Sequence, residues 1–175
     1  MKIKLFAATA CLMLLSFAGQ AQSLKIGYVK VEKLFAEWPD TKKSNTELQE
    51  YEELLSSRLQ AKIQDFQTKY AAYQKNAGTM DAVTRQDTET ELQNLQTQIQ
   101  QYESNAQQSI AEKNSALIKP LQDKMRTTID QVAKENGYSH VFAYGTALVF
   151  TTDKAGDITP KVAQKLGFTL SADAQ

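Results

Sequence analysis

The chain has 175 residues, with 20 basic and 20 acidic side chains and a formal net charge of zero at pH 7. This length suits one domain of ordinary size, and the charge balance lacks the basic excess that nucleic-acid-binding proteins carry. The single cysteine is Cys11, so the chain beyond it can form no disulfide and no cysteine-based metal site.

The first 21 residues have the pattern of a secretory signal peptide. A short basic start at 1–4 precedes an apolar run at 5–18, and small residues end at Ala21. A retained membrane anchor is the alternative, which the shortness of the run disfavours. Cleavage would remove Lys2 and Lys4, leaving 18 basic and 20 acidic residues and a net charge of −2. We therefore expect an exported protein that stabilises itself by packing or by oligomerising.

The next residues are predicted to form a strand and a short helix. Apolar residues alternate with polar or small ones along Leu24–Val29, which is typical of a strand with one buried face. The apolar spacing of Val31–Phe35 predicts a short helix. Trp38 should end it, because the residue before Pro39 is steered away from helical angles.

Two long amphipathic segments, roughly 41–77 and 81–136, dominate the chain. Their apolar residues recur at steps of three and four, which predicts one apolar stripe on each of two helices. The first stripe contains Leu48, Tyr51, Leu55, Leu59, Ile63, Phe66, Tyr70, Tyr73 and Ala77. The second contains Leu92, Leu95, Ile99, Tyr102, Ala106, Ile110, Leu117, Leu121, Met125, Ile129 and Val132. We expect an antiparallel helical hairpin, a coiled-coil arm with its tip near 76–81.

Three features distinguish this hairpin from a regular coiled coil. Three successive steps of four between Tyr51 and Ile63 indicate a stutter, which loosens a left-handed supercoil. At roughly 80 Å against 55 Å, the second helix outruns the first and must pack on something else as well. Pro120 interrupts the second helix and predicts a kink between a free arm and a root that packs on a body.

Local signals mark the helix ends. The first helix is expected to begin near Asp40 or Thr41, or at the capping box Ser44–Glu47. Gly78 is placed to close it in the left-handed conformation. The cap candidates of the second helix are Thr79 and Asp81.

Between Leu92 and Ile118 the polar positions are mostly glutamine and asparagine, and the only charged residues are Glu103, Glu112 and Lys113. Glutamine offers hydrogen bonds without a fixed charge. One interpretation is an ordinary solvated helix face. The other is a surface that lies against many different chains without strong charge preference.

The chain after Gly137, which should stop the second helix, returns to β-rich sequence. Two runs at 138–144 and 147–152 flank Gly145-Thr146 and predict a β-hairpin. Thr159 and Pro160 are predicted to cap and open a last helix at 161–166, which Gly167 ends.

The helical hairpin brings its two feet together, so the first strand and the β-hairpin can share a sheet. We predict a mainly α (α+β) fold with a β-rich body at 22–38 and 137–175 and an arm at 39–136. Apolar residues on both faces at Leu148–Phe150 predict burial against other copies of the chain. The residues assigned to this oligomerisation body are Ile26, Tyr28, Val29, Val141, Phe142, Leu148, Val149 and Phe150.

The sequence carries no recognisable catalytic or metal-binding pattern. His140 is the only histidine, so a zinc site or a Ser-His-Asp triad would rest wholly on it. The glycines are scattered singly and form no phosphate-binding loop. We therefore expect neither catalysis nor a cofactor.

Several motifs, in their order and spacing, resemble the Skp/OmpH family of periplasmic chaperones over nearly the whole exported chain. They are the strand Lys25–Val29, the long hairpin with Pro120, the segment Val132–Tyr138, the pair Val149-Phe150 and the segment Asp157–Val162. The resemblance implies a jellyfish-like homotrimer whose body is built from strands of three chains and whose arms surround a cavity. It also implies ATP-independent holding of unfolded outer-membrane proteins in the periplasm.

The chain departs from well-known family members in its charge. Those members are basic, whereas this chain would be slightly acidic after export, so a lipopolysaccharide or membrane-surface partner is unsupported by charge. The rival interpretations are a tethering coiled-coil protein of the cell envelope and an amphipathic helix protein on membranes. Aromatic residues facing a shared cavity would favour the chaperone, and the candidates are Phe66, Tyr70, Tyr73 and Tyr102.

Overall fold

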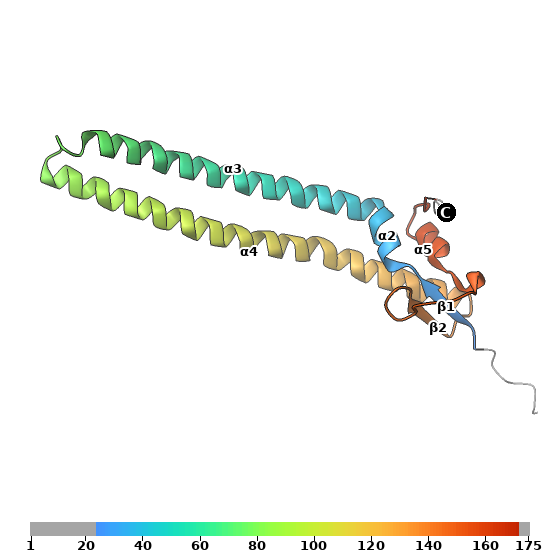
Figure 1. Ribbon diagram of the computed structural model, residues 1–175. Coiled ribbons are helices and arrows are strands. Elements are labelled where there is room, and N and C mark those ends of the chain that lie inside the picture. The colour runs from blue at the N-terminus through green and yellow to red at the C-terminus, as the bar shows by residue number, and fades with distance from the viewer. Residues whose placement is uncertain (1–23, 172–175) are drawn as a thin grey trace, which may run out of the picture.

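Residues 24–171 are described by the computed structural model, in which two long helices extend together from a small body (Figure 1). The predicted signal peptide lies outside the described residues. The elements are β1 (Ile26–Val29), α2 (Val31–Glu37), α3 (Pro39–Asn76), α4 (Ala82–Glu135), β2 (His140–Ala143), η1 (Lys154–Gly156) and α5 (Thr159–Lys165).

The two long helices form the predicted antiparallel hairpin. α3 has 38 residues and α4 has 54. Polar pairs join them along their length: Lys124 Nζ lies 3.0 Å from Asp40 Oδ2 near the body, and Tyr73 Oη lies 2.5 Å from Glu89 Oε1 near the tip. Leu55 and Leu92 are buried in the seam between the helices. We call α3 together with residues 82–119 of α4 the arm.

The last part of α4 packs on the body, as its extra length predicts. Its buried residues Leu121, Met125 and Val132 join one hydrophobic cluster. The other buried members of this cluster are Val29, Leu34, Trp38, Ile158, Val162 and Ala163. α4 is assigned as one continuous helix through Pro120, so the predicted kink at this residue remains a prediction. We call residues 24–38 and 120–171 the body.

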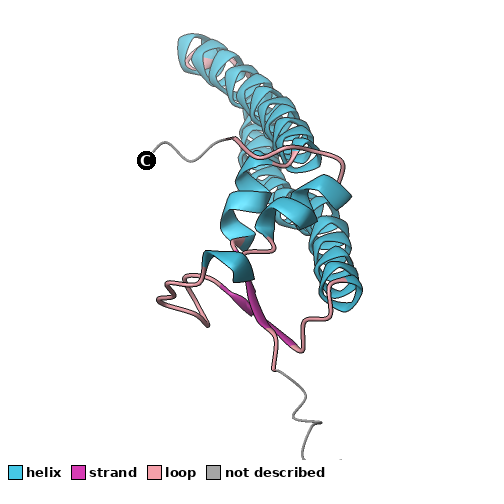
Figure 2. Ribbon diagram, turned by 90° about the vertical axis from the view of Figure 1, so that its right-hand side faces the viewer, coloured by secondary structure: helices cyan, strands magenta, loops and turns pink. Residues whose placement is uncertain are grey.

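The sheet differs from the prediction. It consists of β1 and β2 paired in parallel, with Ile26 opposite His140 and Val29 opposite Ala143 (Figure 2). The whole hairpin forms the crossover between them, which is how the two ends of the chain meet. The expected β-hairpin is wrong: after β2, Tyr144 and Leu148 form a single bridge, and 149–152 have no strand assignment.

A tight turn explains why the second run leaves the sheet. The carbonyl of Ala143 accepts hydrogen bonds from the backbone N–H groups of Ala147 and Leu148, at 3.0 and 3.1 Å. Gly145, at φ 90°, donates to the Leu148 carbonyl. The chain thus closes on itself at 143–148 instead of running back along β2.

The predicted single buried face of β1 is also wrong. Gly27, Tyr28 and Val29 are all buried, whereas Leu24 and Ile26 are 63% and 44% exposed. Val29 enters the core, while a Cβ at position 27 would lie 2.9 Å from the Tyr138 ring. Both faces of the strand's end are therefore covered within one chain.

The ends of the long helices follow the sequence in part. α3 begins at Pro39, earlier than predicted, because proline suits the first helical position and holds Trp38 extended (φ −64°, ψ 124°). The predicted left-handed Gly78 is wrong, since it is not among the described residues with positive φ. Asp81 caps α4 as predicted: its Oδ1 accepts from the N–H groups of Val83 and Thr84, both at 3.0 Å.

The glycine stops are confirmed, but the predicted cap of α5 is not. Gly137 and Gly167 have φ values of 68° and 89°. Thr159 is the first residue of α5 rather than its cap, and its N–H donates to Asp157 Oδ1 at 2.9 Å. Its hydroxyl instead accepts from the N–H of Lys30 at 2.9 Å, which ties α5 to the start of α2.

Candidate functional site

The body exposes apolar side chains on its sheet and on the loop after β2. Val149 and Phe150 are 81% and 76% exposed, and Ile26 and Phe142 are also exposed. β2 has one paired neighbour, β1, in the described part of the chain. An open strand edge beside exposed apolar side chains can pair with another chain.

The eight residues assigned to the oligomerisation body do not all lie on this surface. Val29 is 2% exposed and belongs to the protomer's own core. Tyr28 is 8% exposed, with its ring centroid 5.5 Å from that of Tyr144. Burial, and then the nearby Asp157 carboxylate, raise the pKa of Tyr28. Val141 and Leu148 are half-buried. The role of the set in assembly remains a prediction.

Sequence patterning missed two exposed apolar residues of the body. Leu24 is 63% exposed and Tyr144 is 38% exposed. Tyr144 lies outside the predicted set, although its N–H donates to the Val29 carbonyl and extends the parallel pairing by one step. The sequence clue to Tyr144 is that aromatic residues continue to alternate with small ones after Phe142.

Three of the four aromatic candidates on the arm gather near its tip. Phe66, Tyr70 and Tyr73 line a hollow of about 320 Å³ together with Leu92, Glu89, Gln93 and Gln96. The rings of Phe66 and Tyr70 stack, with centroids 5.9 Å apart and planes 12° apart. The Tyr73 hydroxyl donates to Glu89, and this hydrogen bond is the main reason why the pKa of Tyr73 is raised. The hollow therefore offers aromatic faces beside uncharged amides.

Tyr102, the fourth candidate, lies elsewhere on the arm. Its hydroxyl is 3.5 Å from the carbonyl of Leu55, and Lys62 Nζ lies 5.6 Å from its ring centroid. It closes the seam between α3 and α4 near the middle of the arm. The structure thus separates it from the aromatic group at the tip.

The predicted stutter coincides with a second hollow in the arm. Leu55, Leu59, Ala106 and Ile110 line a space of about 200 Å³. Three successive steps of four keep α3 from presenting Leu55 and Leu59 in a regular coiled-coil register. On α4, the small Ala106 does not fill the gap.

Ion pairs flank the seam of the arm. Lys113 Nζ lies 2.5 Å from Glu47 Oε1, and this hydrogen bond lowers the pKa of Glu47. Lys69 pairs with Glu91, which raises the pKa of Lys69. Such exposed pairs contribute little each, and they mainly select the antiparallel register.

The described residues show no built site for a metal ion. Among residues 24–171, no group of three or more His, Cys, Asp or Glu side chains could hold one. His140 instead stacks on Phe142, with ring centroids 6.3 Å apart. Within the same residues, no helix combines the length and the apolar character that crossing a bilayer requires.

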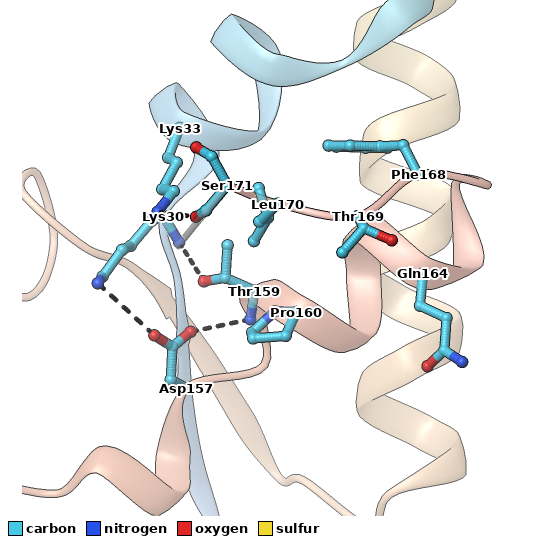
Figure 3. Close-up of a pocket in the computed structure, with 10 residues that line it drawn as sticks. All are labelled: Lys30, Lys33, Asp157, Thr159, Pro160, Gln164, Phe168, Thr169, Leu170 and Ser171. Atoms are coloured by element: carbon cyan, nitrogen blue, oxygen red, sulfur yellow. Dashed lines mark hydrogen bonds and ion pairs between the residues drawn. The ribbon is translucent and has the colours of Figure 1, made fainter. Parts of the chain in front are cut away.

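The body also has a hollow of about 530 Å³ that no sequence pattern indicates (Figure 3). Lys30 and Lys33 line one side, and Asp157 and Thr159 line the base of α5. The chain after α5, Phe168–Ser171, lines the remaining side. Phe168 and Leu170 alternate with Thr169 and Ser171. This pattern suggests one buried face, but it does not say against which element the segment packs.

Comparison with known proteins assigns the chain to a family. The family model described as outer membrane protein (OmpH-like) matches residues 25–166, and the chain belongs to this family. The chain is 26% identical over 156 residues to the chaperone protein Skp of Yersinia enterocolitica, covering 87% of this chain and 92% of that protein.

A solved structure shows the same fold. A crystal structure from Caulobacter crescentus, described as an OmpH-like outer membrane chaperone, superposes with a TM-score of 0.74. The match covers 86% of this chain and 92% of that chain at 14% identity. The family assignment agrees with the resemblance inferred from the sequence and with a non-enzymatic protein.

Proposed function

We propose that this protein is an ATP-independent holdase chaperone, which binds unfolded outer-membrane proteins and prevents their aggregation. The observation that carries this proposal is the arm. It extends well beyond the body (Figure 1). Near its tip, aromatic side chains line an open hollow. A 38-residue helix that stabilised only its own domain would need no such surface. The family match and the chaperone name of the Yersinia relative support the same function.

The chemistry of the arm suits an unfolded barrel protein. Strands of such clients alternate apolar and polar residues, and their backbone groups are unpaired before folding. Aromatic faces at Phe66 and Tyr70 can cover apolar side chains, and Gln93 and Gln96 can hydrogen-bond backbone groups. The client-facing role of Phe66, Tyr70, Tyr73 and Tyr102 is part of this proposal.

A holdase assay tests the function. Purified protein should suppress the aggregation of a urea-unfolded outer-membrane barrel when the urea is diluted, at near-stoichiometric ratio and without ATP. The double variant F66A/Y70A should suppress less, whereas Q67A, on an exposed position between them, should match the parent. If the parent protein does not suppress aggregation, the result would support the rival function, a tethering coiled-coil protein of the cell envelope.

We also propose that three copies assemble through the body, with three arms around a shared cavity. The exposed Val149 and Phe150 and the open edge of β2 support assembly between copies. The number three comes from the family resemblance. Native mass spectrometry should find a trimer, and V149D/F150D should shift the mass towards the monomer. A parent protein that stays monomeric would contradict this part of the proposal.

Export to the periplasm, with residues 1–21 acting as a signal peptide, completes the proposal. The sequence pattern of these residues and the name of the matched family support it. N-terminal sequencing of protein recovered from the periplasm should begin at Gln22. Recovery of uncleaved chain from the membrane fraction would contradict it.

The rival function is a tether of the cell envelope that binds one folded partner. Apolar residues confined to the seam would favour it, and Leu55 and Leu92 are indeed buried there. Tyr70, at 44% exposed, lies outside the seam and favours the chaperone. A lipopolysaccharide or membrane-surface partner remains unsupported by the slightly acidic charge.

A further inference from the structure

The chain after α5 turns back onto the body. Gly167, at φ 89°, reverses its direction, and the N–H of Phe168 donates to the Ala163 carbonyl at 3.0 Å. Phe168 and Leu170 pack against the hydrophobic cluster of the body. This segment lies beyond residues 25–166, the part that the family model matches.

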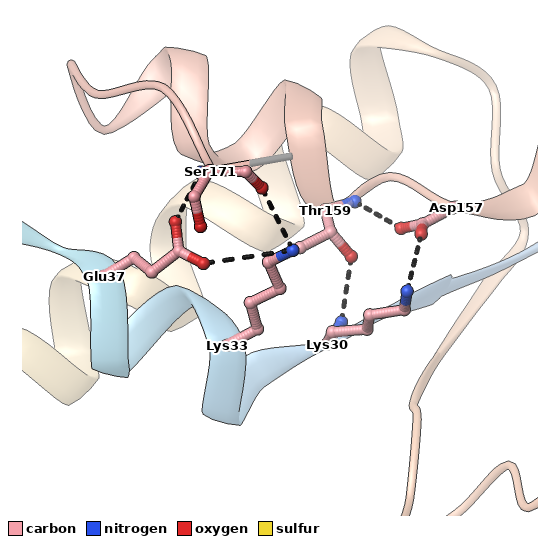
Figure 4. Close-up of polar contacts among 6 residues, drawn as sticks. All are labelled: Lys30, Lys33, Glu37, Asp157, Thr159 and Ser171. Atoms are coloured by element: carbon pink, nitrogen blue, oxygen red, sulfur yellow. Dashed lines mark hydrogen bonds and ion pairs between the residues drawn. The ribbon is translucent and has the colours of Figure 1, made fainter. Parts of the chain in front are cut away.

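The far end of the segment attaches to α2 (Figure 4). The N–H of Ser171 donates to Glu37 Oε2 at 2.6 Å, and Lys33 Nζ donates to the Ser171 carbonyl at 3.3 Å. Lys33 Nζ also lies 3.9 Å from Glu37 Oε1. One backbone unit is thus held from both its N–H and its carbonyl side by two side chains of one helix.

The place of attachment is next to the root of the arm. Glu37 is the last residue of α2, and Trp38 is the only residue between it and α3. Trp38 is extended, and it is the residue at which the two helices meet: its N–H donates to the Leu34 carbonyl of α2, and its carbonyl accepts from the N–H of Lys42 in α3. Any contact that fixes the last turn of α2 therefore fixes the direction in which α3 leaves the body.

The segment spans a hollow rather than lying on a closely packed surface. The space of about 530 Å³ separates it from the start of α2 and the base of α5 (Figure 3). A connection that rests on few contacts opens at lower free energy than the core around it. The points that hold it are Phe168 and Leu170, which pack on the hydrophobic cluster, and Ser171, which bonds to α2.

We propose that Gly167–Ser171 is a strap that locks α2 to α5 and thereby sets how rigidly the arm is attached to the body. With the strap bound, the joint at Trp38 is held. With the strap released, the last turn of α2 and the first turn of α3 fluctuate more against α5, and the arm swings more widely. The proposal concerns the attachment of the arm and does not depend on what the arm binds.

Hydrogen exchange of the full chain tests the strap. E37Q should speed amide exchange in α2 and the first turns of α3, residues 31–45, on the order of three- to tenfold, because it weakens a charge-assisted hydrogen bond. Truncation after Gly167 should have a larger effect on the same residues. Exchange near Leu92, in the arm, should stay unchanged. E50Q removes an exposed carboxylate of α3 away from the strap and serves as the matched control.

The direction of the effect helps to separate the strap from a local helix effect. Within α2 alone, E37Q removes an unfavourable interaction with the helix dipole but also removes the pair with Lys33, two effects of similar size and opposite sign. The helix alone therefore predicts little change in exchange, whereas the strap requires faster exchange. Slower or unchanged exchange in E37Q would overturn the proposal, as would an equal rise throughout the body.

A distance measurement reads out the arm itself. Spin labels at G78C, on the tip, and T152C, on the body, in a background without Cys11 and diluted with unlabelled chain, should give a broader distance distribution in E37Q than in the parent. F168A releases the other end of the strap. It replaces the truncated chain as a test if that chain does not fold. Unchanged distributions in both substituted chains would contradict the strap.

Discussion

The arm and the body of this protein are stabilised differently. The body has one cluster in which Leu34, Trp38, Met125, Ile158 and Val162 are almost fully buried. The arm, among its described residues, buries Leu55 and Leu92 in the seam and Thr41 next to the body. Its remaining contacts are half-buried or are exposed polar pairs. A body of this kind unfolds as one unit, whereas an arm of this kind can open locally.

The largest expected effect comes from the body's core. Trp38→Ala should lower the free energy of unfolding by about 3–5 kcal/mol, the usual cost of removing a large buried aromatic side chain. Trp38 is 1% exposed, and Lys124 Nζ lies 5.1 Å from its ring centroid. Denaturant unfolding measures the loss. A change below about 1 kcal/mol would show that the body's core is not the cooperative centre of the fold.

A matched truncation in the arm should have a smaller and more local effect. Leu92→Ala should cost about 2 kcal/mol, the low end of the range for buried leucine, because the two helices can close around the cavity. Hydrogen exchange should rise in the arm and stay unchanged at Ile158 and Val162. Equal exchange changes in arm and body would remove the distinction between them.

A steric test addresses the sheet. Gly27→Ala should cost about 1–3 kcal/mol by overpacking. The added methyl carbon would lie 2.9 Å from the Tyr138 ring and 3.2 Å from the Gly156 carbonyl oxygen. Thermal unfolding measures the effect. Gly78→Ala is the control, since a Cβ there meets nothing within 4 Å, and it should leave the melting temperature unchanged.

The smallest predicted effect lies at the tip and depends on pH. Hydrogen bonds from Thr84 and from the backbone N–H groups lower the pKa of Asp81 below its ordinary value of 3.8. A carboxyl group whose pKa is lowered on folding stabilises the folded state fully above pH 3.8. It loses that contribution as the pH falls through the lower folded pKa.

Asp81→Asn isolates this effect, because asparagine caps a helix about as well but does not titrate. Exchange at the start of α4 should therefore rise with acid in the parent more steeply than in the variant. Identical acid profiles would mean that the Asp81 carboxylate does not hold the tip.

Periodic features were predictable because they depend on neighbours in sequence. The apolar steps of three and four required two long helices, the Trp38-Pro39 pair required a break, and Asp81 supplied a cap, all of which the structure confirms. Local signals were wrong where a distant group competed with them. Thr159 bonds the N–H of Lys30 instead of capping α5.

The sequence predicted which aromatic residues the arm carries, but it predicted their positions relative to one another only in part. Phe66, Tyr70 and Tyr73 recur at steps of four and three on one helix face, so their gathering follows from the helical repeat. Tyr102 shares their chemistry, but the register between α3 and α4 places it beside Leu55. That register depends on contacts across the hairpin, which no single segment encodes.

The sequence alone determined the long hairpin, its unequal helices and the family resemblance, because helical periodicity and chain order are local properties. Only the tertiary structure decided the parallel pairing of β1 with β2, the turn that takes Val149 and Phe150 out of the sheet, and the return of Phe168–Ser171 onto α2. Each of these joins residues more than 100 positions apart or rests on backbone hydrogen bonds of an irregular loop. Such contacts are selected by the packed molecule as a whole, and no local pattern in the chain specifies their partners.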